Sequence, residues 1–500
     1  MLARTFTLLV LLATAATAQT THYVATTGNN TTGNGTVGNP WATIEFAVDQ
    51  VSDGDLILVQ PGDYVGRVRF DRTFAQGITI RSAMPYQARL RNNDRVITVY
   101  SGQGITVEGF DIAHSGPGSA PLVIHVQDLI GPPGGTDFVS RITFRNNVIH
   151  DSWDNDLLKI NNGAGDVLVE GNLFYNQSGS DEHIDVNSVT DVEIRDNVFF
   201  NDFAGSSRPN NNDTSGFIVV KDSNADDDSN LGSLRVDIRR NVFLHWEGSP
   251  GSNFVLIGED GQPFYEAIDV LVENNLMLGD SGNDMRAAFG VKGAQSIVFR
   301  HNTVSGDLPA AAFAMRLNRE GANLQNDDIH FWGNVWSDAT GTMGIPTGGG
   351  PLDFSDTPPA DTTANWSLDT NVYWNGGAAL PFQAGELINP SDDPNPTVGD
   401  PVLTSPAGAV LPRWDPVGNL FVDGSTSIHE VFVNLVQTYG RPGSGSVVSG
   451  VADPANAPVD DILGRPRPMT GIDAGAYQES ILFADGFESG DTSSWSVTVP

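Results

Sequence analysis

One short pattern recurs along this chain and limits the folds that it can adopt. The pattern is apolar, any, apolar, any, any, Asn, apolar or Thr, apolar, and eight segments match it, from ITFRNNVI to WSLDTNVY. Alternating apolar residues turn one face of a strand inward, and asparagine tolerates the left-handed backbone of a corner. The shortest step between the asparagines, 25 residues, suits one coil of a solenoid. The eight asparagines are Asn147, Asn172, Asn197, Asn241, Asn275, Asn302, Asn334 and Asn371.

Coils of this kind predict an all-β chain that forms a right-handed parallel β-helix, with the asparagines stacked as a hydrogen-bonded ladder inside one turn. ITVEGFDI (105–112) is a degenerate earlier copy with Phe110 in the asparagine position. Segment 41–51 predicts a short helix that caps the N-terminal end, and segment 428–440 predicts a helix over the last coil. The Gly- and Pro-rich stretch 340–362 predicts a loop within the stack.

The chain divides into three parts. Residues 1–18 predict a secretory signal peptide, because Arg4 precedes an apolar run too short to span a bilayer and Ala16-Thr17-Ala18 follows. Residues 19–480 form the expected β-helix with its loops and C-terminal cap. Residues 481–500 form a tail that resembles a recurring tail of exported proteobacterial proteins. We therefore expect a secreted bacterial protein, monomeric and without a membrane span, whose large core replaces disulfides, since cysteine is absent.

The net charge of the chain limits the classes of partner that it can be expected to bind. There are 61 acidic and 26 basic residues, and the formal net charge is −35. Such a balance excludes nucleic acid as the expected partner, because nucleic-acid binding calls for a basic surface. It also disfavours an acidic polymer unless a bound cation or a local basic patch offsets the repulsion.

A local basic patch is predicted from the lysines. The chain has only three, Lys159, Lys221 and Lys292, and each lies in a segment that should form the strand before an asparagine strand. Aligned by their inward apolar residues, these segments place all three lysines in one outward column, which also holds Asp185, Gly258 and Arg316. With strands about 4.8 Å apart, Lys159 and Lys221 should lie roughly 10 Å from each other. Such a row suits an extended anionic polymer, and a ladder of salt bridges with neighbouring acids is the structural alternative.

An acidic cluster is predicted beside this column. WDNDLLK contributes Asp154 and Asp156, and SGSDEHID contributes Asp181, Glu182 and Asp185. Asp156 and Asp181 are one coil length apart, so they should be neighbours on stacked turns. Hard cations such as Ca²⁺ take six to eight oxygen ligands, and without a cation these carboxylates would repel one another. The cluster predicts a metal site, with an exposed acidic loop as the alternative.

About 70 residues around this cluster resemble family 9 of the polysaccharide lyases. DNDLLK, then GNLFYNQSGSDEHID, then a lysine 36 residues after Asp185 carry the resemblance. The family contains calcium-dependent pectate lyases on a parallel β-helix. The resemblance implies that Lys221 is the catalytic base. It implies a calcium site formed by Asp156, or Asp154 in its place, with Asp181, Glu182 and Asp185.

We therefore expect a lyase that cleaves a uronic-acid-containing polysaccharide by β-elimination, with calcium as its cofactor. The basic side chains near the site would bind the acidic polysaccharide, and His183 beside the acidic cluster would contact it as well. The expected substrate-binding residues are Lys159, Lys292, Arg316, Arg286 and His183.

Three other functions fit the same sequence. Glu259, Asp260 and Asp222 lie near Lys221 and allow a glycoside hydrolase with an acid pair. A uronate C5-epimerase shares the proton abstraction. A surface β-helix that binds glycans or calcium without catalysis is the non-enzymatic alternative, and the fold alone does not choose among them.

Overall fold

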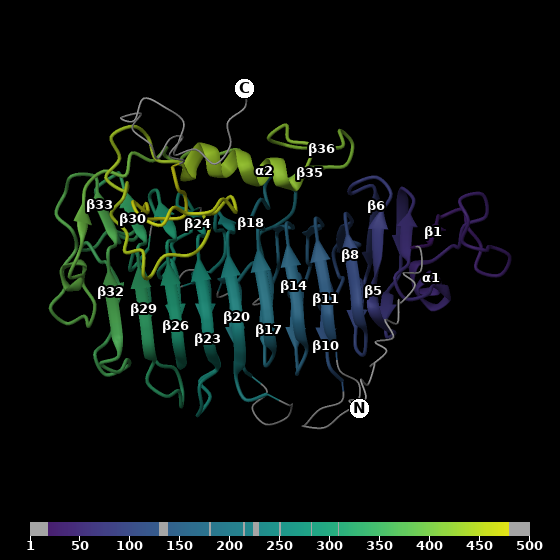
Figure 1. The fold of residues 1–500 in the computed structure, drawn as a ribbon, viewed down its shortest axis with the longest axis horizontal. Coiled ribbons are helices and arrows are strands. Elements are labelled where there is room, and N and C mark those ends of the chain that lie inside the picture. The colour runs from purple at the N-terminus through teal and green to yellow at the C-terminus, as the bar shows by residue number, and fades with distance from the viewer. Residues whose placement is uncertain are drawn as a thin grey trace, which may run out of the picture.

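A computed structural model gives the structure of the chain. It describes residues 19–479 except 130–138, 180–181, 214–215, 224–229, 250–251, 282 and 309. The predicted signal peptide, tail segment 481–500 and Asp181 therefore lie outside the described residues. In the described part, the chain winds through three parallel sheets in turn, which confirms the predicted right-handed parallel β-helix (Figure 1).

The first sheet holds the asparagine-preceding strands and faces the viewer in Figure 1. Its strands, in spatial order, are β1 (Thr21–Val24), β2 (Leu56–Val59), β5 (Thr73–Ser82), β8 (Gln103–Glu108), β11 (Ser140–Arg145), β14 (Gly165–Glu170), β17 (Thr190–Arg195), β20 (Ser233–Arg239), β23 (Ala267–Glu273), β26 (Ala294–Arg300), β29 (Asp327–Trp332) and β32 (Trp366–Asp369).

The second sheet follows the asparagines. Its strands are β3 (Gly62–Val65), β6 (Ala88–Asn92), β9 (Asp111–His114), β12 (Val148–His150), β15 (Leu173–Tyr175), β18 (Val198–Phe200), β21 (Val242–Phe243), β24 (Leu276–Leu278), β27 (Thr303–Ser305), β30 (Val335–Asp338), β33 (Val372–Asn375) and β34 (Thr397–Val398).

The third sheet completes each coil and carries the three lysines. Its strands are β4 (Val68–Phe70), β7 (Ile97–Val99), β10 (Ile124–Gln127), β13 (Leu158–Asn161), β16 (Ile184–Asn187), β19 (Gly216–Lys221), β22 (Asn253–Ile257), β25 (Phe289–Val291), β28 (Met315–Leu317) and β31 (Ser355–Asp356). The last of these, β31, lies inside stretch 340–362, which was predicted to be entirely loop.

The asparagine ladder joins the first and second sheets at one corner. Asn241 shows the repeated geometry: its Nδ2 donates to the Ile194 carbonyl at 2.9 Å and to Asn275 Oδ1 at 3.0 Å. Its own Oδ1 accepts from the backbone and side-chain nitrogens of Asn197, both at 3.0 Å. The same bonds run from Asn147 to Asn371 without a break. The eight predicted asparagines are all buried and all structural.

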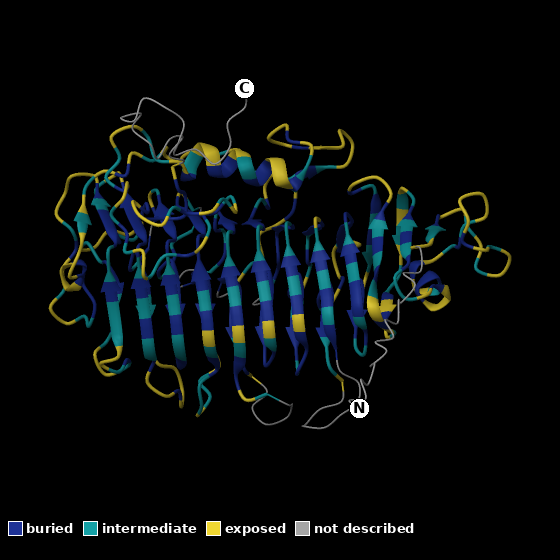
Figure 2. Ribbon diagram, viewed as in Figure 1, coloured by how far each residue is buried: buried dark blue, intermediate teal, exposed yellow. Residues whose placement is uncertain are grey.

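Apolar side chains fill the interior, and Figure 2 shows the strands largely buried and the loops exposed. Rings stack from coil to coil: Phe199 lies 5.0 Å from Phe174 and 4.9 Å from Phe243 between ring centres. Helix α1 (Ile44–Gln50) begins at Thr43, whose side chain accepts from the Phe46 amide, and buries Ile44, Ala47 and Val48 in the core. The predicted N-terminal capping helix is confirmed.

The second helix differs from its prediction in position. Helix α2 (Ile428–Leu435) continues as a π-helical turn, Val436–Gly440, but it does not cover the last coil. Its apolar face packs on the outside of the second sheet, against residues of β12, β15, β18, β21 and β24 (Figure 1). The reason is that these strands have apolar residues on both faces and need a cover.

The segment around α2 runs back along the stack and is fastened at several coils. A short hairpin of β35 (Trp414–Asp415) and β36 (Leu420–Phe421) precedes α2, and the Ile428 amide at the start of the helix donates to the hydroxyl of Tyr86. Arg240 pairs with Asp460 at 2.5 Å. Arg467 donates to Asn274 Oδ1 at 2.9 Å. A 3₁₀ turn, η1 (Pro390–Asp392), ends the ladder, since Asp393 accepts from Asn371. None of the described helices has the length and apolar character needed to cross a membrane.

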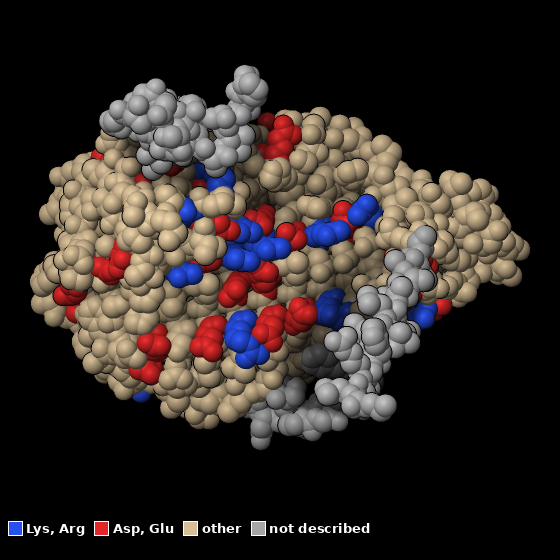
Figure 3. Space-filling model, viewed as in Figure 1, with Lys and Arg blue, Asp and Glu red and all other residues tan. Residues whose placement is uncertain are grey.

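The outer face of the first sheet carries charges in rows, as Figure 3 shows. Neighbouring strands contribute opposite charges: Arg145 donates to Glu108 at 2.8 Å and Arg300 donates to Glu273 at 2.8 Å. Such cross-strand pairs stabilise a sheet modestly. Many charges on this face are therefore paired between neighbouring strands.

We predict that Asn241→Ala lowers the free energy of unfolding by about 2 kcal/mol or more. The substitution leaves the Asn197 amide and the Ile194 carbonyl buried without their partner, and an unmade buried hydrogen bond costs about 1–3 kcal/mol. Urea denaturation measures the change. Asn211→Ala is the control, because Asn211 is exposed outside the ladder. Equal effects of the two substitutions would contradict the structural role of the ladder.

Candidate functional site

The candidate site lies where strands of the third sheet begin. Asp185 is on β16, with its side chain on the outer face of the sheet. Glu182 lies in the turn that leads into β16, and Asp156 lies in the turn that leads into β13 one coil earlier. These turns connect the second sheet to the third, so stacking brings the acids together.

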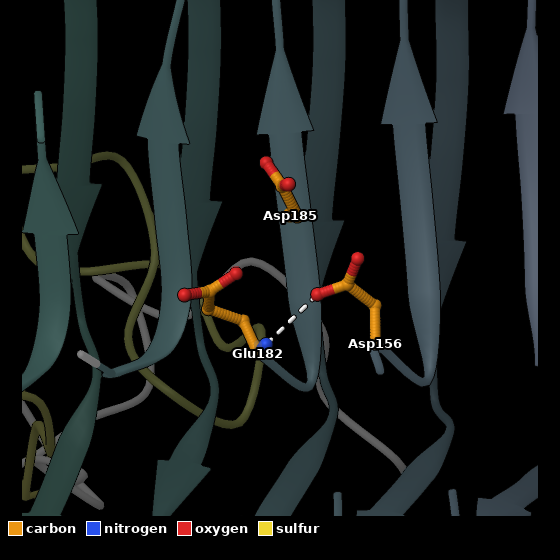
Figure 4. Close-up of side chains that lie close together, drawn as sticks. All are labelled: Asp156, Glu182 and Asp185. Carbon is orange, nitrogen blue, oxygen red and sulfur yellow. Dashed lines mark hydrogen bonds between the residues drawn. The ribbon is translucent and has the colours of Figure 1, made fainter. Parts of the chain in front are cut away.

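Asp156, Glu182 and Asp185 form a buried acidic triad (Figure 4). One carboxylate oxygen from each lies within 4.8 Å of the others, and the three residues are at most 1 % exposed. The Glu182 amide donates to Asp156 Oδ1 at 2.8 Å, which ties the two turns together. Three converging carboxylates at this spacing can bind a metal ion.

Three of the five predicted ligands form this triad. Asp154 is exposed and lies outside it, so of the two alternatives in this turn the structure brings in Asp156. The difference arises because the turn at 152–155 closes on the Ser152 side chain, which accepts from the Asn155 amide. Asp181 belongs to the residues that the structure does not describe.

The charges of the triad are shaped by burial and by two lysines. Burial raises the pKa of Glu182 well above its usual value; Lys221 opposes this, and the neighbouring carboxylates add to it. For Asp185, burial raises the pKa, but the charges of Lys221 and Lys159 outweigh that and hold it below its usual value. Oδ1 of Asp185 is buried and lacks a hydrogen bond from the described residues. A bound cation would offset the repulsion among these buried carboxylates.

The lysines occupy two outward columns of the third sheet, and the predicted single column is wrong. In the backbone register of the sheet, Asp185 lies opposite Lys159 on one neighbouring strand and opposite Val219 on the other. Lys221 lies opposite Asn187. Lys221 and Lys292 share the second column, whereas Arg316, which pairs with Gly290, returns to the first. A two-residue shift leaves every apolar residue facing inward, so the apolar pattern could not fix this register.

Each of the three lysines on this face is paired with an acid of the next coil. Lys159 donates to Asp185 at 2.5 Å, Lys221 to Glu259 at 2.6 Å and Lys292 to Glu320 at 2.6 Å. The predicted substrate-binding residues Arg286 and Arg316 both form ion pairs with Asp356, at 2.6 Å and 3.4 Å. The salt-bridge ladder weighed as the structural alternative is therefore present, and the sequence analysis missed Glu320 and Asp356. Asp356 lies on β31, within the stretch predicted as loop.

Lys221 lies on the strand next to that of Asp185 and is largely buried, with 12 % of its side chain exposed. Burial would lower the pKa of Lys221, but the charges of Asp185, Glu182 and the pair Glu259–Asp260 outweigh it and raise the pKa. The triad and the lysine are thus close enough to influence each other's charge.

A buried carboxylate that the sequence analysis missed holds the partners of Lys221 in place. Glu266 Oε2 accepts from the amides of Glu259 and Asp260 at 2.8 and 2.9 Å. Its Oε1 accepts from the Gln262 amide and from Asn323 Nδ2. These bonds fold segment 258–266 into a compact turn beside Lys221.

His183 does not contact the outer face, and the prediction that it binds substrate is wrong. Its ring is fully buried and packs against Phe174, Phe199 and Phe217, with centre distances of 6.4, 6.0 and 4.7 Å. Burial lowers the pKa of His183 well below its usual value. Strand alternation would turn His183 outward with Asp185, but His183 lies in the turn before β16, and its ring enters the core.

His125 is a polar neighbour of Lys159 that the sequence analysis also missed. It occupies the same outward column on β10, and its Nδ1 accepts from Arg95 Nε at 3.2 Å. Tyr100 contacts the same nitrogen at 3.1 Å. Burial, helped by the positive charges of Arg95 and Lys159, lowers the pKa of His125 to about 3. No motif marks this residue in the sequence.

Comparison with known proteins supports the fold. No protein-family model matches the sequence, and no curated protein sequence is similar to it. Among solved structures, pectate lyase Pel9A aligns with a TM-score of 0.50 and 15% identity over 93% of this chain and 98% of that one. XylC in complex with xylose aligns with a TM-score of 0.48 and 12% identity over 92% and 98% of the two chains. The fold resembles that of Pel9A.

We predict that acid destabilises the protein partly through His125. The folded state resists protonation of this ring, whereas the unfolded chain takes the proton near pH 6.5. Stability should therefore fall as the pH drops from about 6.5 towards 3, by about 2 kcal/mol at pH 5 from this group. In His125→Gln, the loss of unfolding free energy between pH 7.5 and 5 should shrink by about that amount.

Urea denaturation at the two pH values measures this change. His429→Gln is the control, because His429 is exposed on α2. An unchanged pH dependence in His125→Gln would refute the assignment.

Proposed function

We propose that this chain is a calcium-dependent lyase that cleaves a uronic-acid-containing polysaccharide by β-elimination. One observation carries the proposal: the buried triad of Asp156, Glu182 and Asp185 lies beside Lys221, which is on the strand next to that of Asp185. β-Elimination on a uronate needs a neutralised carboxylate and a base, and this arrangement supplies a place for each.

The triad suits calcium among the common metal ions. Its donors are all carboxylate oxygens, which hard cations prefer. Calcium binds oxygens at about 2.3–2.6 Å, so two ligands of one ion lie up to roughly 5 Å apart, in keeping with the 4.8 Å limit in the triad. Asp185 Oδ1, buried and without a hydrogen bond from described residues, is oriented by the contact of Oδ2 with Lys159.

The reaction would proceed on the outer face of the third sheet. Bound calcium would neutralise the substrate carboxylate and so make the C5 proton acidic. Lys221 Nζ, once it leaves Glu259 and gives its own proton to solvent, would take the C5 proton as a neutral amine. The electron pair of the broken C5–H bond would form the C4–C5 double bond, the C4–oxygen bond would break, and a proton from solvent would complete the hydroxyl of the departing sugar. The acids that raise the pKa of Lys221 include two triad members, Glu182 and Asp185, whose charge the cation would compensate.

The remaining cations would bind neighbouring sugars of the acidic polysaccharide. Lys292 lies in the column of Lys221, two strands away, and Arg286 and Arg316 converge on Asp356 further along. Arginine binds carboxylates in a bidentate manner. An anionic chain along this face would exchange places with the acids that now pair these cations. We also propose that the protein is exported and meets this polymer outside the cell.

A second candidate is a glycoside hydrolase that uses Glu259 and Asp260. Burial, with the charges of Glu259 and Glu266, raises the pKa of Asp260 to about 6 against the opposing charge of Lys221, which suits a general acid. Asp222, weighed with them, is buried and accepts from the Gly232 amide, so it holds a turn.

We predict that Lys221→Ala abolishes lyase activity. Polygalacturonate, alginate and glycosaminoglycans are incubated with the protein and calcium, and the ultraviolet absorbance of the unsaturated product is followed. Loss of the base should lower kcat at least about 100-fold. Lys292→Ala is the matched control and should mainly raise KM. New reducing ends without absorbance, lost in Asp260→Asn, would instead establish the hydrolase.

We predict that calcium stabilises the protein through the triad. At a calcium concentration one hundred times Kd, the gain should be about 2.7 kcal/mol, and chelator should remove it. Glu182→Gln should lose this gain while the metal-free protein stays at least as stable, because the substitution removes a buried carboxyl whose charge burial disfavours.

Thermal and urea unfolding with and without calcium measure these effects. Asp154→Asn is the control from the same turn, and it should respond to calcium as the unsubstituted protein does, because Asp154 is exposed outside the triad. A full calcium response in Glu182→Gln would contradict the site.

A further inference from the structure

A buried arginine links the turns that deliver two members of the triad. Arg208 lies in the segment 201–213, between β18 and β19, and only 2 % of its side chain is exposed. Its Nη2 donates to the Ser152 carbonyl and to Ser178 Oγ, both at 2.6 Å. Its Nη1 donates to Asp151 Oδ1 at 2.9 Å and to the Asn176 carbonyl at 3.3 Å. One guanidinium thus joins two consecutive turns.

Those two turns lead directly to the triad. Asp151 and Ser152 precede Asp156 by a few residues, and Asn176 and Ser178 stand in the same relation to Glu182. The backbone of the arginine segment adds a further tie, since Gly179 donates to the Asn211 carbonyl and accepts from the Asp213 amide. The segment therefore fixes how far apart the turns of Asp156 and Glu182 lie.

Aromatic rings and a shared carboxylate also hold the guanidinium in place. Trp153 covers one face of it, 4.2 Å from the ring centre, and Phe203 lies at 5.4 Å. The Asp151 carboxylate that it binds also contacts His150 Nδ1 at 2.7 Å and accepts from Asn176 Nδ2 at 3.0 Å. Planar, multiple hydrogen bonds of this kind are specific to arginine, and a lysine ammonium cannot reproduce them.

We propose that Arg208 is a positioning residue that sets the geometry of the acidic triad for a divalent cation. This inference rests on the proposed calcium site. Arg208 touches neither the triad nor the reacting atoms; it acts through the two turns. Residues that orient metal ligands from outside the coordination sphere typically change metal affinity by 10- to 100-fold when substituted.

Calcium titration calorimetry tests the proposal on the full chain. Arg208→Met keeps the length and packing of the side chain but removes the donors, and we expect Kd for calcium to rise at least 10-fold. Arg208→Lys, which keeps the charge, should also weaken binding, because one ammonium cannot hold both turns. Arg235→Met is the control: Arg235 pairs with Asp191 on the exposed face of the first sheet, and its loss should leave Kd unchanged.

Terbium supplies a readout that a merely stabilising role would not move. Its luminescence lifetimes in H₂O and D₂O count the water molecules on the bound ion. A loosened triad should admit at least one more water in Arg208→Met than in the unsubstituted protein. Circular dichroism confirms that each variant is folded at the temperature used.

The outcomes separate the two proposals. If the unsubstituted protein binds no calcium, the proposed site fails and this inference falls with it. If it binds calcium and either Arg208 variant binds equally well, the positioning role alone is overturned. Should Arg208→Met not fold, Ser178→Ala removes one of the four bonds. A rise of a few-fold in Kd then supports the role, and an unchanged Kd overturns it.

Discussion

The asparagine ladder determines where everything else in this molecule lies. Each side chain bonds to the asparagine of the next coil and to a carbonyl of the preceding one, so successive corners are stacked in register. Because the corner joins the first and second sheets, both inherit this alignment. The turns that follow the second sheet then start from equivalent positions in every coil, whatever their length. Acids from different coils can therefore converge at one place.

The third sheet is the variable part of the coil. Its preceding turns range from the short connection 66–67 before β4 to the long segment 339–354 before β31, and the buried acids Asp156 and Glu182 lie in two of these turns. Cations and acids on its outer face pair between coils, while the triad concentrates acids without enough cations. Lys159 and Lys221 supply part of the missing charge from neighbouring strands. That excess of buried acid distinguishes the triad from the cross-strand pairs of the first sheet.

The repeat predicted the coil and the ladder, and segment 41–51 predicted the N-terminal cap, because each follows from a local pattern in the sequence. It could not predict the register of the third sheet, where Lys221 pairs with Asn187 instead of Asp185. A slip by two residues preserves the apolar face and so leaves no trace in the pattern. The choice of Asp156 over Asp154, and the inward turn of His183, depend on turn conformations that no period encodes. Arg208 was invisible for the same reason: its partners lie 30 to 57 residues away, in other turns.

The returning C-terminal segment changes how such a stack can come apart. A plain solenoid holds together through contacts between adjacent coils alone, so its ends can fray one repeat at a time. Here Tyr86 from an early coil, and Arg240 and Asn274 from two neighbouring coils further along, are all bonded to residues between 428 and 467. None of these coils can detach without breaking a bond to segment 428–467, which also binds the others. Segment 428–467 therefore couples coils that do not touch one another, and we expect the stack to unfold as a single cooperative unit.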